Sequence, residues 1–168
     1  DALKFFIRAS NRETIDFEIL DTAELGPGRG NLYARLRGNG AKRAIALVHH
    51  VDVVPADRRA WTVDPFAGVV KDGYVWGRGA IDMKGHGIAH LITLIALKRS
   101  GIQLTRDLVL IANSDEELLG AKGAAVFVQR HADLLKDVEY VITEGTPNRV
   151  ESGRLVHYSV CVAEKLNY

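Results

Sequence analysis

The chain has 168 residues, of which 47% are apolar, so it is long enough for one domain with a sizeable core. Its 22 lysines and arginines nearly balance 21 aspartates and glutamates, and the net charge of +1 gives no basic field that would attract nucleic acid or an anionic membrane. The single cysteine excludes an internal disulfide framework and a zinc site built from several thiolates. No apolar run approaches the ~18 residues of a membrane span. We therefore expect a soluble globular protein that binds neither nucleic acid nor membrane.

Apolar runs that are typical of strands recur along the chain. Strands are expected at residues 31–37 and 43–49, on either side of a Gly-Asn-Gly turn. Residues 107–113 and 138–143 are continuous apolar runs, which favours buried strands. A last strand is expected at residues 154–163.

Helical patterns lie between these strands. The clearest covers about residues 84–99, where one apolar stripe is predicted by the spacing of Ile88, Leu91, Ile92 and Ile95. Further helices are expected at 120–131 and 132–136. Strands that alternate with helices predict an α/β fold, with a mixed, mostly parallel twisted sheet and helices on both faces.

Acidic and imidazole side chains follow three of the predicted strands. Open α/β sheets build their sites at the carboxyl ends of strands. The residues in question are His50 with Asp52, Glu116 with Glu117, and Glu144. Asp82 comes from a glycine-rich turn that leads into the long helix. This placement favours a common site, although each pattern alone has a plainer interpretation.

The His-x-Asp pattern has a direct use in metal binding. Residues two apart project to the same side of an extended segment, so Asp52 can hold the second ring nitrogen of a metal-binding His50. A simple hydrogen bond within a loop is the alternative. For Asp82, the neighbouring glycines let the backbone turn tightly and bring the carboxylate to a defined point. The alternative for Asp82 is a helix N-cap.

Glu116 and Glu117 are adjacent carboxylates, which repel each other unless they share a cation or a proton. One of them can bind metal while the other takes a proton from water. A solvated acidic loop is the alternative, and for Asp115 we expect such a loop, a turn or a residue that contacts a metal ligand. The occurrence of all these patterns in this order favours a metal-dependent hydrolase.

The motifs that carry these residues resemble the M20 family of metallopeptidases, which includes zinc carboxypeptidases, aminoacylases, acetylornithine deacetylase and succinyl-diaminopimelate desuccinylase. They span roughly residues 25–165 and read H-V-D-V-V-P, W-T-V-D-P-F, Y-V-W-G-R-G-A-I-D-M-K-G, S-D-E-E-L-L-G-A-K-G and T-E-G. The resemblance implies a zinc-exopeptidase-like catalytic domain. It also implies a hydrolase that cleaves the amide or peptide bond of a small N-acyl amino acid or a short peptide.

The same resemblance implies a set of metal ligands. His50 and Glu144 would bind one zinc ion, Glu117 would bind the other, and the carboxylate of Asp82 would bridge the two. Cobalt or manganese would also suit ligands of this kind. Two such ions would polarise the amide carbonyl and the attacking water.

Catalytic roles are implied for two further residues. Glu116 would be the general base and acid, and Asp52 would orient His50. The resemblance also implies a cis peptide bond between Asp82 and Met83.

The sequence departs from the family in one respect. Members of the family take their last zinc ligand from a histidine far downstream, beyond a lid domain that often forms a dimer interface. We therefore expect residues 1–168 to be a partial catalytic domain without that lid and without the C-terminal catalytic segment, and the full-length form to be a homodimer. His49, His86 and His157 are the available substitutes for the missing ligand, and each is interpreted as a structural residue instead.

Two other functions remain open. The chain could be a truncated, non-catalytic binding or assembly module that retains part of the metal site, or a one-metal or non-zinc amidohydrolase. No leader is visible, which favours the cytoplasm, but the chain begins with Asp1 rather than Met, so an upstream segment can be missing.

Overall fold

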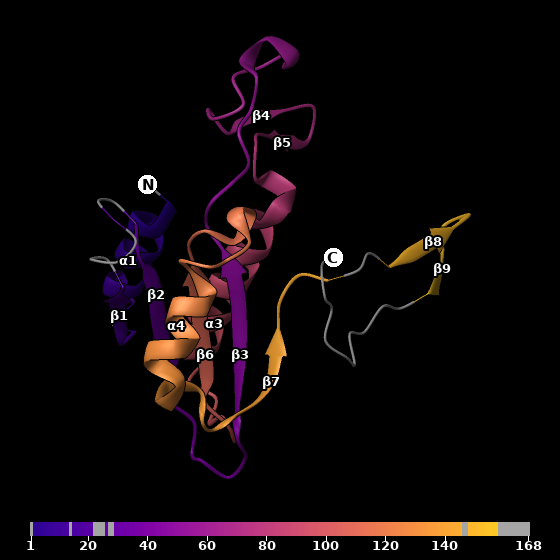
Figure 1. Cartoon of the computed structure of the whole chain (residues 1–168). Coiled ribbons are helices and arrows are strands. Elements are labelled where there is room, and N and C mark those ends of the chain that lie inside the picture. Colours follow the sequence, from indigo (N-terminus) through magenta and orange to yellow (C-terminus); the bar gives the residue numbers. More distant parts are fainter. Residues whose placement is uncertain (1, 14, 22–25, 27–28, 146–147, 158–168) are drawn as a thin grey trace.

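The computed structural model describes residues 2–13, 15–21, 26, 29–145 and 148–157. Its centre is a five-stranded sheet in the order β1-β2-β6-β3-β7 (Figure 1). These strands are β1 (Phe17–Leu20), β2 (Asn31–Leu36), β3 (Ala44–His50), β6 (Leu108–Asn113) and β7 (Val138–Ile142).

The sheet is mixed, as the sequence predicts. β2 pairs antiparallel with β1 and with β6, whereas β3 pairs parallel with both β6 and β7. β2 and β3 flank the expected turn but do not pair, because β6 lies between them. The three parallel strands β6, β3 and β7 are those followed by the acidic and imidazole residues.

Two small ribbons lie outside this sheet (Figure 1). One consists of β4 (Val69–Lys71) and β5 (Tyr74–Trp76), and the other of β8 (Arg149–Glu151) and β9 (Arg154–His157). β9 is the described part of the strand expected at 154–163, and residues 158–163 lie outside the described residues.

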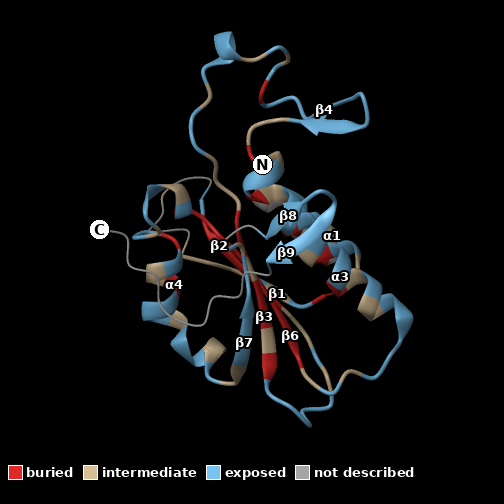
Figure 2. Ribbon diagram, turned by 90° about the vertical axis from the view of Figure 1, so that its right-hand side faces the viewer, coloured by how far each residue is buried: buried red, intermediate tan, exposed pale blue. Residues whose placement is uncertain are grey.

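Helices cover both faces of the sheet, as predicted, and Figure 2 shows the buried strands between them. α1 (Ala2–Arg12) and α3 (His86–Ser100) pack on one face, where Phe6, Leu91 and Leu94 are buried against β2, β3 and β6. α4 (Ala124–His131) packs on the other face through Phe127, and a short 3₁₀ turn, Ala132–Leu135, follows it. Alternate side chains of each inner strand point to the two faces, so one sheet supplies both cores.

The buried side of α3 differs from the predicted stripe. Leu91 and Leu94 are buried together with Gly87, whereas Ile92 is 57% exposed and Ile88 is 37% exposed. The prediction was therefore wrong for Ile88 and Ile92. The helix turns Gly87 toward the sheet because β3 presents the ring of His49 there, and no side chain at position 87 blocks the approach.

The expectation that β7 is buried was also wrong. Tyr140, Val141 and Ile142 are each more than half exposed. β7 is the last strand of the described sheet, with β3 on one side only. A continuous apolar run predicts a strand at this place, but it does not show what covers the strand.

An ionic network lies at the end of the sheet remote from His50. Asp107 accepts hydrogen bonds from the amide of Gly38 (2.7 Å), from Arg35 Nε (2.6 Å) and from Arg37 (3.1 Å), and Arg35 also binds Asp137. Burial alone would raise the pKa of Asp107, but these hydrogen bonds hold it below its usual value.

Candidate metal centre

Three strand ends and one turn bring all the predicted site residues together. β6, β3 and β7 are parallel neighbours, so their carboxyl ends share one edge of the sheet. His50 is the last residue of β3, Glu116 and Glu117 open the 3₁₀ turn after β6, and Glu144 follows β7. Asp82 reaches the same place from the irregular turn Ala80–Gly85 that leads into α3.

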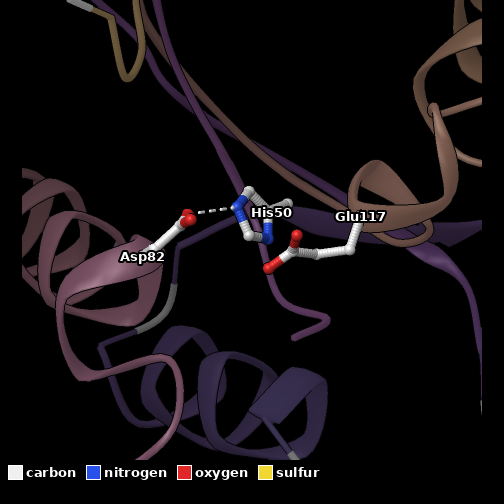
Figure 3. A group of neighbouring side chains, drawn as sticks. All are labelled: His50, Asp82 and Glu117. Carbon is white, nitrogen blue, oxygen red and sulfur yellow. Dashed lines mark hydrogen bonds and ion pairs between the residues drawn. The ribbon is translucent and has the colours of Figure 1, made fainter. Parts of the chain in front are cut away.

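His50 lies at the centre of this arrangement. Its Nε2 atom is 3.0 Å from Asp82 Oδ1 and 3.8 Å from a carboxylate oxygen of both Glu116 and Glu144. Figure 3 shows the imidazole between the carboxylates of Asp82 and Glu117. The imidazole is buried, whereas the side chain of Asp82 is 65% exposed. An ion or a substrate can therefore approach from the solvent side.

The donor atoms form two overlapping groups that could each hold a metal ion. One comprises His50, Asp82 and Glu117, and the other comprises His50, Glu116 and Glu144; within each group the ligand atoms lie within 4.8 Å of one another. Imidazole nitrogen and carboxylate oxygen are ligands that suit zinc, manganese or cobalt, so the residues fit a divalent ion. The resemblance assigns Glu117 and His50 to different ions, whereas here they share a group.

The substitute ligands considered from the sequence stand apart from both groups. Among the described residues, neither group includes His49, His86 or His157. His49 points into the core, and His157 is exposed on β9. Burial, with the neighbouring His90 and His50, lowers the pKa of His49 to about 3, so its ring is neutral.

The electrostatics of the centre favour positive charge. Burial alone would lower the pKa of His50, but hydrogen bonds to Asp52 and Asp82, with the negative charge of Glu144, raise it to about 9. Burial raises the pKa of Glu144 above its usual value, and the charges of Asp82 and Glu116 act in the same direction. Carboxylates this close together repel each other, and a cation among them would relieve that repulsion.

Asp52 makes more contacts than the His-x-Asp pattern indicates. His50 Nδ1 lies 3.0 Å from the main-chain oxygen of Asp52 and 3.6 Å from its carboxylate. A carbonyl oxygen can only accept, so Nδ1 donates its proton to it, and Nε2 faces the carboxylates. The Asp52 carboxylate accepts the backbone N–H groups of Glu116 (3.2 Å) and Glu117 (3.1 Å). Burial alone would raise the pKa of Asp52, but these contacts hold it below its usual value.

The turn that carries Asp82 has the expected cis peptide bond between Asp82 and Met83. Gly79 has a φ of 84°, and a Cβ atom on Gly85 would lie 2.7 Å from the carbonyl oxygen of Ala80. Both positions therefore require glycine. Asp82 does not cap α3, because Gly85 occupies the N-cap position, so the alternative interpretation of Asp82 was wrong.

Asp115, the residue that opens the loop after β6, is held in a buried turn. Asp115 is buried, adopts a φ of 70° and accepts the N–H of Lys122 (3.1 Å). A Cβ atom on Gly123 would lie 1.5 Å from the carbonyl oxygen of Ser114, so only glycine fits there. The solvated alternative for Asp115 was wrong, and the expectation of a turn is confirmed.

A cavity of about 340 Å³ opens beside the centre. Glu117 and Asp52 line it on the side of the centre, and its apolar wall consists of Val51, Val53, Val54, Pro55 and Leu118. Sequence reasoning missed this wall, because it forms only when the segment after β3 folds against the loop after β6. Sequence reasoning also missed the role of Lys84, whose Nζ donates a hydrogen bond to the carbonyl oxygen of Val51 (3.1 Å).

Known proteins are similar to this chain in sequence and in fold. A bacterial succinyl-diaminopimelate desuccinylase from Methylobacterium radiotolerans is 44% identical over 93 residues, which are 54% of this chain and 23% of that protein. An M20 family metallo-carboxypeptidase from Sulfolobus solfataricus superposes with a TM-score of 0.72 at 24% identity, over 86% of this chain and 32% of that chain. A dinuclear metal-binding peptidase of the M20 family from Bacillus subtilis superposes with a TM-score of 0.57 at 26% identity, over 83% of this chain and 35% of that chain.

The fold and the residues at the sheet edge thus define an α/β domain with a candidate metal centre. The model of peptidase family M20/M25/M40 matches residues 46–160, and the chain belongs to that family. It spans only about a quarter to a third of the length of these relatives. None of the helices that the structure describes is long and apolar enough to cross a membrane.

Proposed function

We propose that the protein containing this chain is a metal-dependent hydrolase that cleaves the amide or peptide bond of small N-acyl amino acids or short peptides. The convergence of His50 with four carboxylates at one sheet edge carries the proposal. Membership of peptidase family M20/M25/M40 supports the reaction class. The chain spans only part of its relatives, and we propose that it forms one part of a catalytic domain.

Four residues would hold the metal: His50, Asp82, Glu117 and Glu144. We propose that these residues would hold two zinc ions, and cobalt or manganese would suit the same donors. The related dinuclear metal-binding peptidase supports the number of ions. When bound, the metal supplies Lewis acidity toward the substrate carbonyl and the attacking water.

Glu116 is the proposed general base and acid. Its carboxylate lies 3.8 Å from His50 Nε2, and half of its side chain is exposed, so it borders both the ligand cluster and the solvent. Glu116 takes a proton from water as the water oxygen bonds to the carbonyl carbon. It then delivers this proton to the amide nitrogen as the C–N bond breaks. Asp52 fixes the turn that presents Glu116, because it accepts the backbone N–H groups of residues 116 and 117.

A small substrate is supported by the size of the neighbouring cavity. About 340 Å³ is at the lower end of the volumes of small-molecule sites, and its apolar wall suits a short acyl group or a side chain. The names of the related desuccinylase and carboxypeptidase support an acyl or peptide substrate.

Metal analysis with a matched activity assay tests the proposal. In the complete protein we expect two zinc ions per chain by elemental analysis, and their loss in Asp82→Ala. We also expect hydrolysis of N-succinyl or N-acetyl amino acids, or of dipeptides, that is abolished in Glu116→Gln while the metal remains bound. A protein that binds no divalent metal contradicts the proposal. Metal binding without hydrolysis of any of these substrates favours the non-catalytic module.

A further inference from the structure

His49, the residue before the proposed ligand His50, lies between the metal centre and the apolar core. His49 and His50 are consecutive in β3 and therefore point to opposite faces of the sheet. His50 faces the carboxylates, whereas His49 faces α1 and α3 and is only 1% exposed. Neither ring nitrogen of His49 has a hydrogen-bond partner within the part of the chain that the structure describes. The ring therefore acts by its shape rather than by a polar contact.

Aromatic neighbours hold the ring of His49 in place. The ring of Phe6 in α1 lies 4.8 Å away between centroids, and the ring of His90 in α3 lies 5.6 Å away. Buried side chains between such neighbours cannot swing aside without displacing them. His49 is thus a rigid spacer between β3 and the two helices.

The first turn of α3 rests directly on this spacer. A Cβ atom added to Gly87 would lie 2.6 Å from His49 Cδ2, 3.0 Å from Nε2 and 3.2 Å from Cγ, so the imidazole lies directly against the backbone of Gly87. All three atoms belong to the buried ring, which has no room to retreat. The thickness of the ring and the absence of a side chain at Gly87 together set how closely α3 approaches β3.

The same two elements carry two of the proposed ligands. β3 ends in His50, and the turn that holds Asp82 leads directly into the first turn of α3. The 3.0 Å contact between His50 Nε2 and Asp82 Oδ1 therefore spans the gap that His49 and Gly87 define. A change in that gap moves one ligand relative to the other.

We propose that His49 is a positioning residue of the metal centre, which sets the distance between His50 and Asp82 through its contact with Gly87. This inference rests on the proposed function, because it requires that these residues bind metal. The alternative is a histidine that only fills the core. That alternative predicts a loss of stability on mutation without a change in metal binding.

A double-mutant cycle in the complete protein separates these two readings. Co²⁺ affinity is measured by chelator competition, with the visible absorption spectrum of bound Co²⁺ as a report on ligand geometry. Gly87→Ala should weaken binding by about tenfold or more and change the spectrum, as expected when a ligand is displaced. In the His49→Ala background the same Gly87→Ala change should cost markedly less, because the methyl group then occupies space that the ring has left.

Gly38→Ala is the matched control. A Cβ atom there would lie 2.5 Å from the carbonyl oxygen of Arg106, a comparable conflict at the opposite end of the sheet. It should lower the melting temperature in chelator without altering Co²⁺ affinity. If Gly87→Ala fails to fold, the double variant takes its place and must fold and bind Co²⁺ as well as His49→Ala does.

Three results overturn the positioning role. The first is an unaltered Co²⁺ affinity and spectrum in folded Gly87→Ala, and the second is an equal loss with and without His49. The third is a double variant that does not bind Co²⁺ although His49→Ala does. An unaltered protein that binds no metal would refute the proposed function itself, which distinguishes the two failures.

Discussion

Asp52→Asn tests how the loop after β6 is held at the metal centre. The carboxylate of Asp52 accepts two backbone N–H groups, from Glu116 at 3.2 Å and from Glu117 at 3.1 Å, and faces the ring of His50. Asparagine keeps one acceptor oxygen and turns an NH₂ group toward one of these donors. At least one charge-assisted hydrogen bond is therefore lost.

The size of the effect follows from that contact. A hydrogen bond to a charged group contributes about 1.5–3 kcal/mol, and each 1.4 kcal/mol is roughly a factor of ten in affinity. Because the loss frees the turn that carries Glu117, zinc affinity should fall roughly 10- to 100-fold, the range found when the partner of a ligand is removed. Chelator competition at fixed pH measures this change.

Asp57→Asn is the control for that experiment. Asp57 also accepts a backbone N–H group, from Arg59 at 3.0 Å, but in an exposed 3₁₀ turn away from the centre. Its substitution should leave zinc affinity unchanged. If Asp52→Asn binds zinc within about threefold of the unaltered protein, the proposed role of the carboxylate in holding the loop is refuted.

Three further outcomes are expected. Glu116→Gln should lower kcat roughly 10²- to 10⁴-fold with zinc retained, and equal losses of rate and zinc would argue against a general base. The pKa of Asp107 lies below its usual 3.8 because hydrogen bonds from Gly38 and Arg35 outweigh burial, so the unfolded chain binds the proton more readily. The stability from Asp107 is therefore present above pH 3.8 and is lost as the pH falls through the lower folded value. In Asp107→Asn the melting temperature should fall less steeply as the pH is lowered through the acid range. An unchanged pH dependence of the melting temperature would contradict this linkage. Phe127→Ala should lower the free energy of unfolding in urea by about 3–5 kcal/mol, because the ring is buried against one face of the sheet. A loss under about 1 kcal/mol would show that the surrounding core fills the cavity left by the ring.

The strands that carry the site could be predicted because each is a run of apolar residues that ends in a polar group. The run before His50 and the run before Glu116 are examples, and both are confirmed as the parallel strands β3 and β6. The ribbon β4–β5 and the strand β1 were missed, because strands of three or four residues leave too short an alternation to recognise.

Features that depend on tertiary contacts were less accessible to sequence reasoning. The apolar spacing in α3 predicted Ile88 and Ile92 as buried, yet the contact between His49 and Gly87 decides which side of the helix meets the sheet. The hydrogen bonds of Asp52 to a turn more than 60 residues away were likewise hidden, because nothing local to Asp52 specifies where that turn folds.

The spacing of the four proposed ligands along the chain has a consequence for folding. Positions 50, 82, 117 and 144 are separated by roughly 30 residues each, and bound cations would join them as non-covalent cross-links. Such links would close three long loops, and the free energy of metal binding would then become part of the free energy of folding. Bound metal would therefore stabilise the loops at this edge of the sheet in addition to its role as a Lewis acid. Removal of the metal by a chelator would destabilise the loops after β3, β6 and β7 together.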